Sequence, residues 1–107
     1  AEYERLQRLL KQMVATPPFH YFVLGMVAMK SRDYRSARDY FEQEIRRAGY
    51  NAEFHFWLSA AYLGLEDASN ARKHLIIARE NATTGGEREL YSLKLQELQA
   101  LQAQHRY

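Results

Sequence analysis

The histidines are the side chains of this sequence best suited to metal chemistry, because neutral imidazole is the commonest metal ligand in proteins. The chain has four of them. His20 and His55 are 35 residues apart, almost one length of the sequence repeat described below, so they could lie on neighbouring helices. A zinc site needs at least a third protein ligand, which this pair lacks. We therefore expect packed or surface histidines, with no metal and no other cofactor.

Acidic side chains that could act as a general acid and base gather in the middle of the chain. They are Asp39, Glu42, Glu44 and Glu53. Arginines at positions 38, 46 and 47 are interleaved with them, which is typical of a solvated helix face. The sequence also has no cysteine nucleophile, no HExxH pair and no glycine-rich phosphate loop, and Gly85-Gly86 indicates a loop and a helix start. We therefore predict that the protein is not an enzyme.

Basic side chains cluster around one predicted turn, where they could contact phosphate. They are Lys30, Arg32, Arg35 and Arg38. Asp33 and Asp39 interrupt this cluster, and the formal net charge of the chain is only +2. A nucleic-acid surface needs a denser basic stripe, so we expect no nucleic-acid partner.

The length of 107 residues allows one domain with a modest core. The longest apolar run, residues 19–29, is interrupted by His20 and is far shorter than the roughly 20 residues that span a bilayer. We therefore expect no membrane insertion, and we see no signal peptide. The chain begins at Ala1, which suggests a processed protein or a fragment of a larger one. The lack of cysteine suits a reducing or an oxidising compartment; a cytoplasmic location is slightly favoured, and a periplasmic or other extracytoplasmic one stays open.

Apolar residues recur at helical spacing along the whole chain, and the alternation typical of strands is absent. The sequence therefore predicts an all-α fold of about six helices. Their expected ranges are 2–14, 19–30, 34–49, 52–64, 68–82 and 85 to beyond 101. Expected N-caps are Thr16 before Pro17, then Asp33, Asp67, and Thr84 with Glu87 at capping-box spacing. Short connections make neighbouring helices antiparallel, so the helices should form three hairpins.

The sequence repeats when it is shifted by 34 residues. The matching pairs are Leu24 with Leu58, Asp33 with Asp67, Ala37 with Ala71, and Phe41 with Leu75. Helices approach to about 8–10 Å only where small side chains lie at their crossing. Gly25 opposite Ala37, and Ser59 opposite Ala71, would provide that clearance. Self-similarity at a fixed period is the signature of a repeat architecture.

These residues resemble the signature of the tetratricopeptide repeat (TPR), a 34-residue helix–turn–helix unit. The matching residues are Tyr21, Leu24, Gly25, Tyr34, Ala37 and Phe41 in residues 18–51, and Leu58, Tyr62, Ala71, Leu75 and Ala78 in residues 52–85. The chain departs from the signature at Ala28, Glu44, His55 and Ser59, and neither unit ends in proline. The resemblance implies a right-handed superhelical stack of antiparallel helix hairpins, a TPR-like α-solenoid. Residues 1–16 would form an N-terminal capping helix and residues 86–107 a C-terminal one, with Tyr91, Leu95 and Leu98 facing inward.

The resemblance also implies a concave face that binds a peptide or helical segment of a partner protein. The expected partner-binding residues are Phe19, Phe22, Met26, Met29, Lys30, Glu53, Phe56 and Leu63. Phe56 follows Phe22 by one repeat, so we expect the two rings to lie side by side. The alternative function is a self-associating structural or regulatory domain of a larger protein or assembly, which would dimerise through the same surface. A groove filled by a helix of the chain itself also stays open.

Overall fold

The computed structural model describes residues 1–15 and 18–104, with side chains described for residues 1–8 and 18–104. These residues form six α-helices and no strand, which confirms the predicted all-α class. The helices are α1 (Glu2–Ala15), α2 (His20–Lys30), α3 (Tyr34–Arg47), α4 (Ala52–Gly64), α5 (Ala68–Glu80) and α6 (Gly85–Gln104). None of them is long and apolar enough to cross a membrane.

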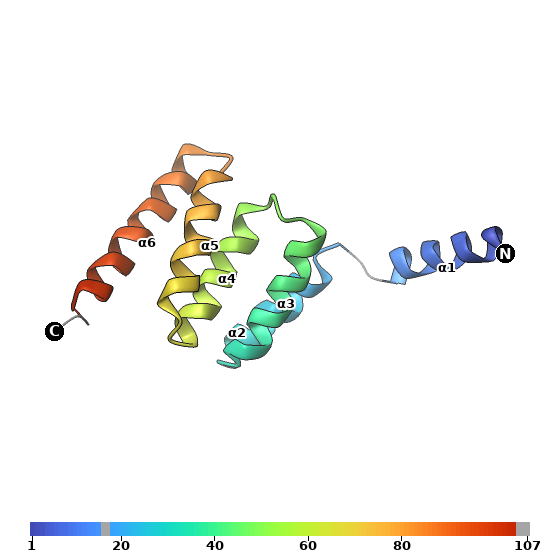
Figure 1. The fold of residues 1–107 in the computed structure, drawn as a ribbon, viewed down its shortest axis with the longest axis horizontal. Coiled ribbons are helices and arrows are strands. Elements are labelled where there is room, and N and C mark those ends of the chain that lie inside the picture. The colour runs from blue at the N-terminus through green and yellow to red at the C-terminus, as the bar shows by residue number, and fades with distance from the viewer. Residues whose placement is uncertain (16–17, 105–107) are drawn as a thin grey trace.

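Helices α2 to α6 lie side by side in chain order (Figure 1). Each of them packs on the next, from α2 on α3 through to α5 on α6. The short turns after α2 and α4 reverse the chain, so α2–α3 and α4–α5 are antiparallel hairpins. The sixth helix follows α5 and packs against it at the C-terminal end of the stack.

The two hairpin turns have the same construction one repeat apart. Arg32 and Glu66 adopt left-handed backbone conformations, with φ of 57° and 60°. The N–H groups of Asp33 and Asp67 donate to the carbonyl oxygens of Ala28 and Tyr62, both at 2.9 Å. Such a left-handed residue with a bond back to the preceding helix is a common way to end a helix.

The predicted N-caps of the helices after these turns are confirmed. The Asp33 carboxylate accepts the Ser36 N–H at 3.2 Å, and the Asp67 carboxylate accepts the Asn70 N–H at 3.1 Å. Thr84 also accepts the Glu87 N–H, at 3.1 Å. The cap predicted at Thr16 and Pro17 lies outside the described residues.

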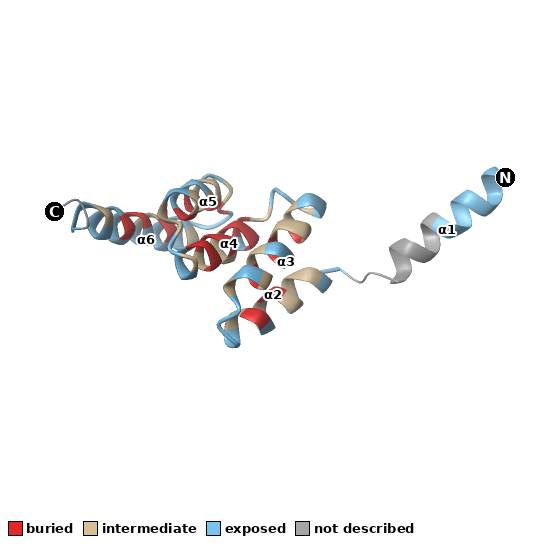
Figure 2. Ribbon diagram, turned by 60° about the horizontal axis from the view of Figure 1, so that its bottom comes forward, coloured by how far each residue is buried: buried red, intermediate tan, exposed pale blue. Residues whose placement is uncertain are grey.

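The small residues at the helix crossings allow the close packing of each hairpin. Ala37 and Ala71 are completely buried, as are Phe41 and Leu58. A methyl group added to Gly25 would overlap the Phe41 ring, so glycine is required for α2 and α3 to approach this closely. The buried residues form two adjoining clusters, one centred on α3 and α4 and one on α5 and α6. Figure 2 shows these buried faces along α4 and α6.

The first helix is not placed as the N-terminal cap that the sequence predicts. It projects away from the other helices (Figure 1), and none of the extensive helix–helix packing includes it. Tyr3 and Leu6, three residues apart on one side of α1, are 72% and 58% exposed. These two apolar side chains are therefore uncovered in the arrangement described here.

Leucine at either alanine crossing should overpack the hairpin. We expect Ala37→Leu and Ala71→Leu each to lower the free energy of unfolding by roughly 1–3 kcal/mol, because no space is left at either position. Chemical denaturation measures the change. Ala100→Leu, on an exposed position of α6, is the control and should have little effect. Unchanged midpoints for both buried variants would contradict the helix register.

Glycine at either left-handed turn position should stabilise the protein. Arg32→Gly and Glu66→Gly remove the steric penalty of a side chain at positive φ, and we expect a gain of roughly 0.5–1 kcal/mol each. The control is Ser31→Gly, at φ −84°, where glycine only adds freedom to the unfolded chain and should destabilise. Thermal and urea denaturation of the three variants would test the difference in sign.

Candidate functional site

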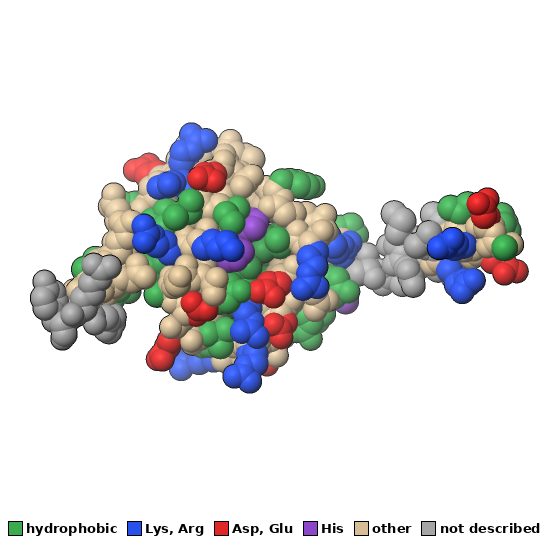
Figure 3. Space-filling model, in the orientation of Figure 1, with side chains coloured by type: hydrophobic (Ala, Val, Ile, Leu, Met, Phe, Trp, Pro, Cys, Tyr) green, Lys and Arg blue, Asp and Glu red, His purple; other side chains and the backbone are tan. Residues whose placement is uncertain are grey.

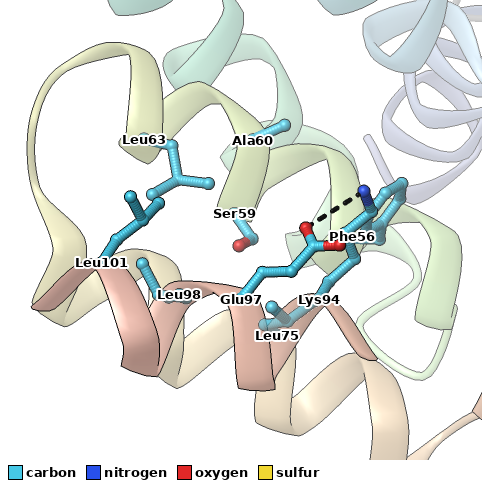
Figure 4. A pocket seen from close by; sticks show the side chains of 9 residues that line it. All are labelled: Phe56, Ser59, Ala60, Leu63, Leu75, Lys94, Glu97, Leu98 and Leu101. Carbon is cyan, nitrogen blue, oxygen red and sulfur yellow. Dashed lines mark hydrogen bonds and ion pairs between the residues drawn. The ribbon is translucent and has the colours of Figure 1, made fainter. Parts of the chain in front are cut away.

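An apolar groove opens between α4 and α6, with α5 beneath it (Figure 4). Its lining residues are Phe56, Ser59, Ala60, Leu63, Leu75, Lys94, Glu97, Leu98 and Leu101. Its volume is about 280 Å³, below the roughly 300–1,000 Å³ typical of small-molecule sites. A space of this size suits one or two side chains better than a cofactor.

Helical spacing brings the α4 part of the lining onto one face. Phe56, Ala60 and Leu63 are four and then three residues apart, so they follow one side of the helix. Ala60 lies between the two larger side chains and leaves room between them. On α5, Leu75 is buried and closes the bottom of the groove.

A buried hydrogen bond holds α4 on α5 beneath the groove. The Ser59 hydroxyl donates to the carbonyl oxygen of Ala71 at 2.8 Å. Both residues are buried, so the hydroxyl has a partner where water cannot reach it. Ser59 therefore serves the helix crossing, although it also lines the groove.

A second hollow extends the groove along α6. It has a volume of about 400 Å³ and shares Leu63, Leu98 and Leu101 with the first. Glu66, Ala68 and Gln102 complete its lining. The two hollows together form a continuous apolar groove whose wall is built by the three shared leucines.

The charged groups of the first hollow lie at its rim. Lys94 Nζ donates to Glu97 Oε2 at 3.4 Å, and both side chains are largely exposed (Figure 4). The pair is three residues apart on α6, a spacing at which opposite charges attract weakly in water. An apolar interior with a polar rim is the usual anatomy of a protein-binding surface.

The structure divides the sequence-predicted partner-binding residues between several places. Phe56 and Leu63 line the groove. Met26 and Met29 are half-buried and pack against the first core cluster, whereas Lys30 and Glu53 are exposed outside the groove lining. Phe19 lies by a smaller hollow near Glu44 and Tyr50, with its ring 5.7 Å from that of Phe54.

The expected pairing of Phe22 with Phe56 is not found. The Phe22 ring contacts Phe41 and Phe54, with ring centroids 5.9 and 5.1 Å away. The Phe56 ring instead contacts that of Tyr91 on α6, with ring centroids 5.2 Å apart. The two rings therefore belong to different core clusters, and Phe22 supports the core rather than the groove.

Sequence reasoning missed the α6 side of the groove, because that helix was interpreted as a solvated cap. The available signal was an excess of leucine. Three inward positions, Tyr91, Leu95 and Leu98, are buried as predicted. Leu90, Leu93 and Leu101 remain exposed, which is more apolar surface than a cap requires.

His55, which was considered as a metal ligand together with His20, pairs with His74 instead. His55 is buried, and its Nδ1 lies 3.1 Å from His74 Nδ1, while its Nε2 lies 2.7 Å from the Gly49 carbonyl oxygen. When both rings are neutral, His55 Nε2–H donates to Gly49 and His74 Nδ1–H donates to His55. His20 is exposed and is not part of this pair. The described residues contain no group of three side chains that could hold a metal ion.

The acidic residues do not all form the solvated face that was predicted. Asp39 is exposed and accepts from Arg38 Nε at 3.1 Å. Glu42 accepts a hydrogen bond of 2.6 Å from the Tyr62 hydroxyl, and burial raises the pKa of that hydroxyl to about 12. Glu44 is buried, with Oε2 3.6 Å from Arg47, because it occupies the inner face of α3. Basic and acidic side chains alternate over the face in Figure 3, without a continuous basic stripe.

Comparison of the chain with protein-family models, with curated proteins and with solved structures finds no match. The groove, its leucine wall and its charged rim are therefore the basis for the functional argument.

The histidine pair should make stability depend on pH. Burial lowers the pKa of both His55 and His74 below the ordinary value of 6.5, and the adjacent histidine further lowers that of His74. As the pH falls, these histidines therefore bind protons at a higher pH in the unfolded chain than in the folded protein. The free energy of unfolding is thus highest above about pH 6.5 and falls as the pH drops through the lowered pKa values of His55 and His74.

We expect His74→Gln to remove roughly half of this fall, because one of two titrating groups is lost. Urea denaturation at several values between about pH 7.5 and about pH 5.5 measures it. His20→Gln, outside the pair, is the control and should keep the fall. A pH dependence that is the same for both variants and the unchanged protein would contradict the role of the pair.

Proposed function

We propose that the protein is a protein–protein interaction module that binds an apolar segment of a partner protein in the groove between α4 and α6. The single observation that carries this proposal is the continuous groove with Phe56, Leu63, Leu98 and Leu101 in its wall. In this proposal the helices form a right-handed TPR-like stack, and α2, α4 and α6 line its concave side.

The chemistry of the lining favours a protein segment over a small metabolite. Small-molecule sites orient their ligands through a few convergent polar groups. Here the Ser59 hydroxyl is already bonded to Ala71, and Lys94 and Glu97 are bonded to each other at the rim. Burial of apolar side chains is what this groove offers, and such anchors dominate the energy of protein interfaces.

A short amphipathic helix with two or three apolar anchors suits a groove that consists of two adjoining hollows. Anchors three or four residues apart would enter the two adjoining hollows in turn. Lys94 and Glu97 would then meet the polar face of the partner helix and set its direction along α6. The partner-binding residues in this proposal are Phe56 and Leu63, which the sequence also predicted, together with Leu98 and Leu101.

Charge placed in the groove should abolish binding without unfolding the domain. Leu63→Glu and Leu101→Glu alter side chains that are 44% and 50% exposed, so the core should tolerate them. Peptides selected from a displayed library against the unchanged domain should bind each variant at least about tenfold more weakly, equal to about 1.4 kcal/mol. Far-ultraviolet circular dichroism checks that the helices remain.

Leu90→Glu is the matched control, because Leu90 is a leucine of α6 with 43% exposure that does not line the groove. Binding by this variant should stay within about twofold of the unchanged domain. Selected peptides that bind all three variants equally well would show that the groove is not the binding site.

A further inference from the structure

One apolar face of α2 is exposed. The corresponding faces of α4 and α6 are each covered by the helix that precedes them. Val23 and Val27 on this face are 57% and 58% exposed. One repeat later, Phe54, Leu58 and Ala61 occupy the positions of His20, Leu24 and Val27, and all three are buried. On α6, the buried residues Tyr91, Leu95 and Leu98 have the same spacing as these three.

In both covered cases the preceding helix buries the face. Phe41 of α3 belongs to the same core cluster as Leu58 and Ala61 of α4. Leu75 and Ala78 of α5 belong to the same cluster as Tyr91 and Leu95 of α6. The exposed face of α2 is therefore the place where a preceding helix would pack in a stack of this kind.

The first helix has the sequence features of that missing neighbour. Its connection to α2, residues 16–19, is as long as the connections 48–51 and 81–84 that lead into α4 and α6. In the sequence, the apolar residues of the first helix are spaced by three, four and three positions: Tyr3, Leu6, Leu10 and Met13. The inward-facing residues of α3 (positions 34, 37, 41 and 44) and of α5 (positions 68, 71, 75 and 78) have the same spacing. In each of these two sets the first residue is half-buried and the other three are buried. Yet α1 projects away from α2, with Tyr3 and Leu6 exposed (Figure 1).

We propose that the exposed face of α2 binds α1 of a second copy of this chain, so that two chains exchange their first helices in a symmetric dimer. The direction of α1 favours exchange over a return onto the same chain, because α1 projects away from α2 of its own chain (Figure 1). Reciprocal exchange covers the exposed faces of α1 and α2 in both copies through two equivalent contacts and leaves no open end.

This contact uses no residue of the groove between α4 and α6, so it stands or falls separately from the proposed peptide binding. Both surfaces are exposed in the single chain, and charge on either of them should therefore weaken the dimer without unfolding the stack. Each copy has one α1 and one α2, so a single substitution removes both contacts of a symmetric dimer.

Sedimentation of the full chain tests the dimer. The unchanged protein should sediment at twice the chain mass at tens of micromolar, and Leu6→Asp and Val27→Asp should both sediment as monomers with unchanged helical circular dichroism. Leu93→Asp, a similarly exposed leucine of α6, is the control and should stay dimeric. A monomeric unchanged protein would overturn the proposal. So would a dimer that Leu101→Asp abolishes and Val27→Asp does not, because α1 would then occupy the groove.

Crosslinking tests which chain provides the helix. The sequence has no cysteine, so only the introduced thiols can react. Copies with Leu6→Cys are mixed with copies carrying Val27→Cys and treated with a short thiol-to-thiol crosslinker. We expect a product of two chains with one of each, and none when Leu93→Cys replaces Val27→Cys. A chain that carries both Leu6→Cys and Val27→Cys should also give two-chain products. Closure of that double variant within one chain would show that α1 folds back, and the proposal would be wrong.

Discussion

Close contact between consecutive helices is the constraint on which the rest of this structure depends. At the crossing of α2 and α3, Gly25 lies so near the Phe41 ring that a single methyl group would collide with it. At the equivalent crossing of α4 and α5, Ser59 meets Ala71 and donates to its carbonyl oxygen. These small residues let the backbones approach, and the large side chains beside them then fill the space between helices.

The groove follows from the same packing. Helices α4 and α6 both lie against α5, so their outer faces diverge above Leu75 and leave a space between them. Most of the residues that line this space are apolar on both helices, and the charged pair Lys94 and Glu97 lies at its rim. A segment that brought its own apolar side chains would complete this packing as a further helix does elsewhere in the stack.

The two hairpins share a backbone arrangement but fill equivalent positions differently. Where α5 has the buried Ala78, α3 has the buried Glu44 beside Arg47. Where α2 has Tyr21 below the Arg47 guanidinium, α4 has His55 bonded to His74 and Gly49. Both ring nitrogens of His55 have partners, whereas Glu44 Oε2 is buried with the ion pair to Arg47 and no hydrogen bond. These polar residues differ between the two hairpins, so the repeat is easier to recognise at its turns and crossings than at every signature position.

The sequence by itself determined the helices, the caps at Asp33 and Asp67 and the small residues at the crossings, because spacing and capping are local properties. It also predicted Phe56 and Leu63 among the partner-binding residues, and both line the groove. It did not predict that Phe22 would pack on Phe54, or that Leu98 and Leu101 would face α4, since these contacts depend on how helices distant in sequence meet. Tertiary structure alone decided that α1 stands apart and leaves Val23 and Val27 uncovered. An apolar stripe shows that a helix face needs a partner, but the choice of partner is a property of the assembled molecule.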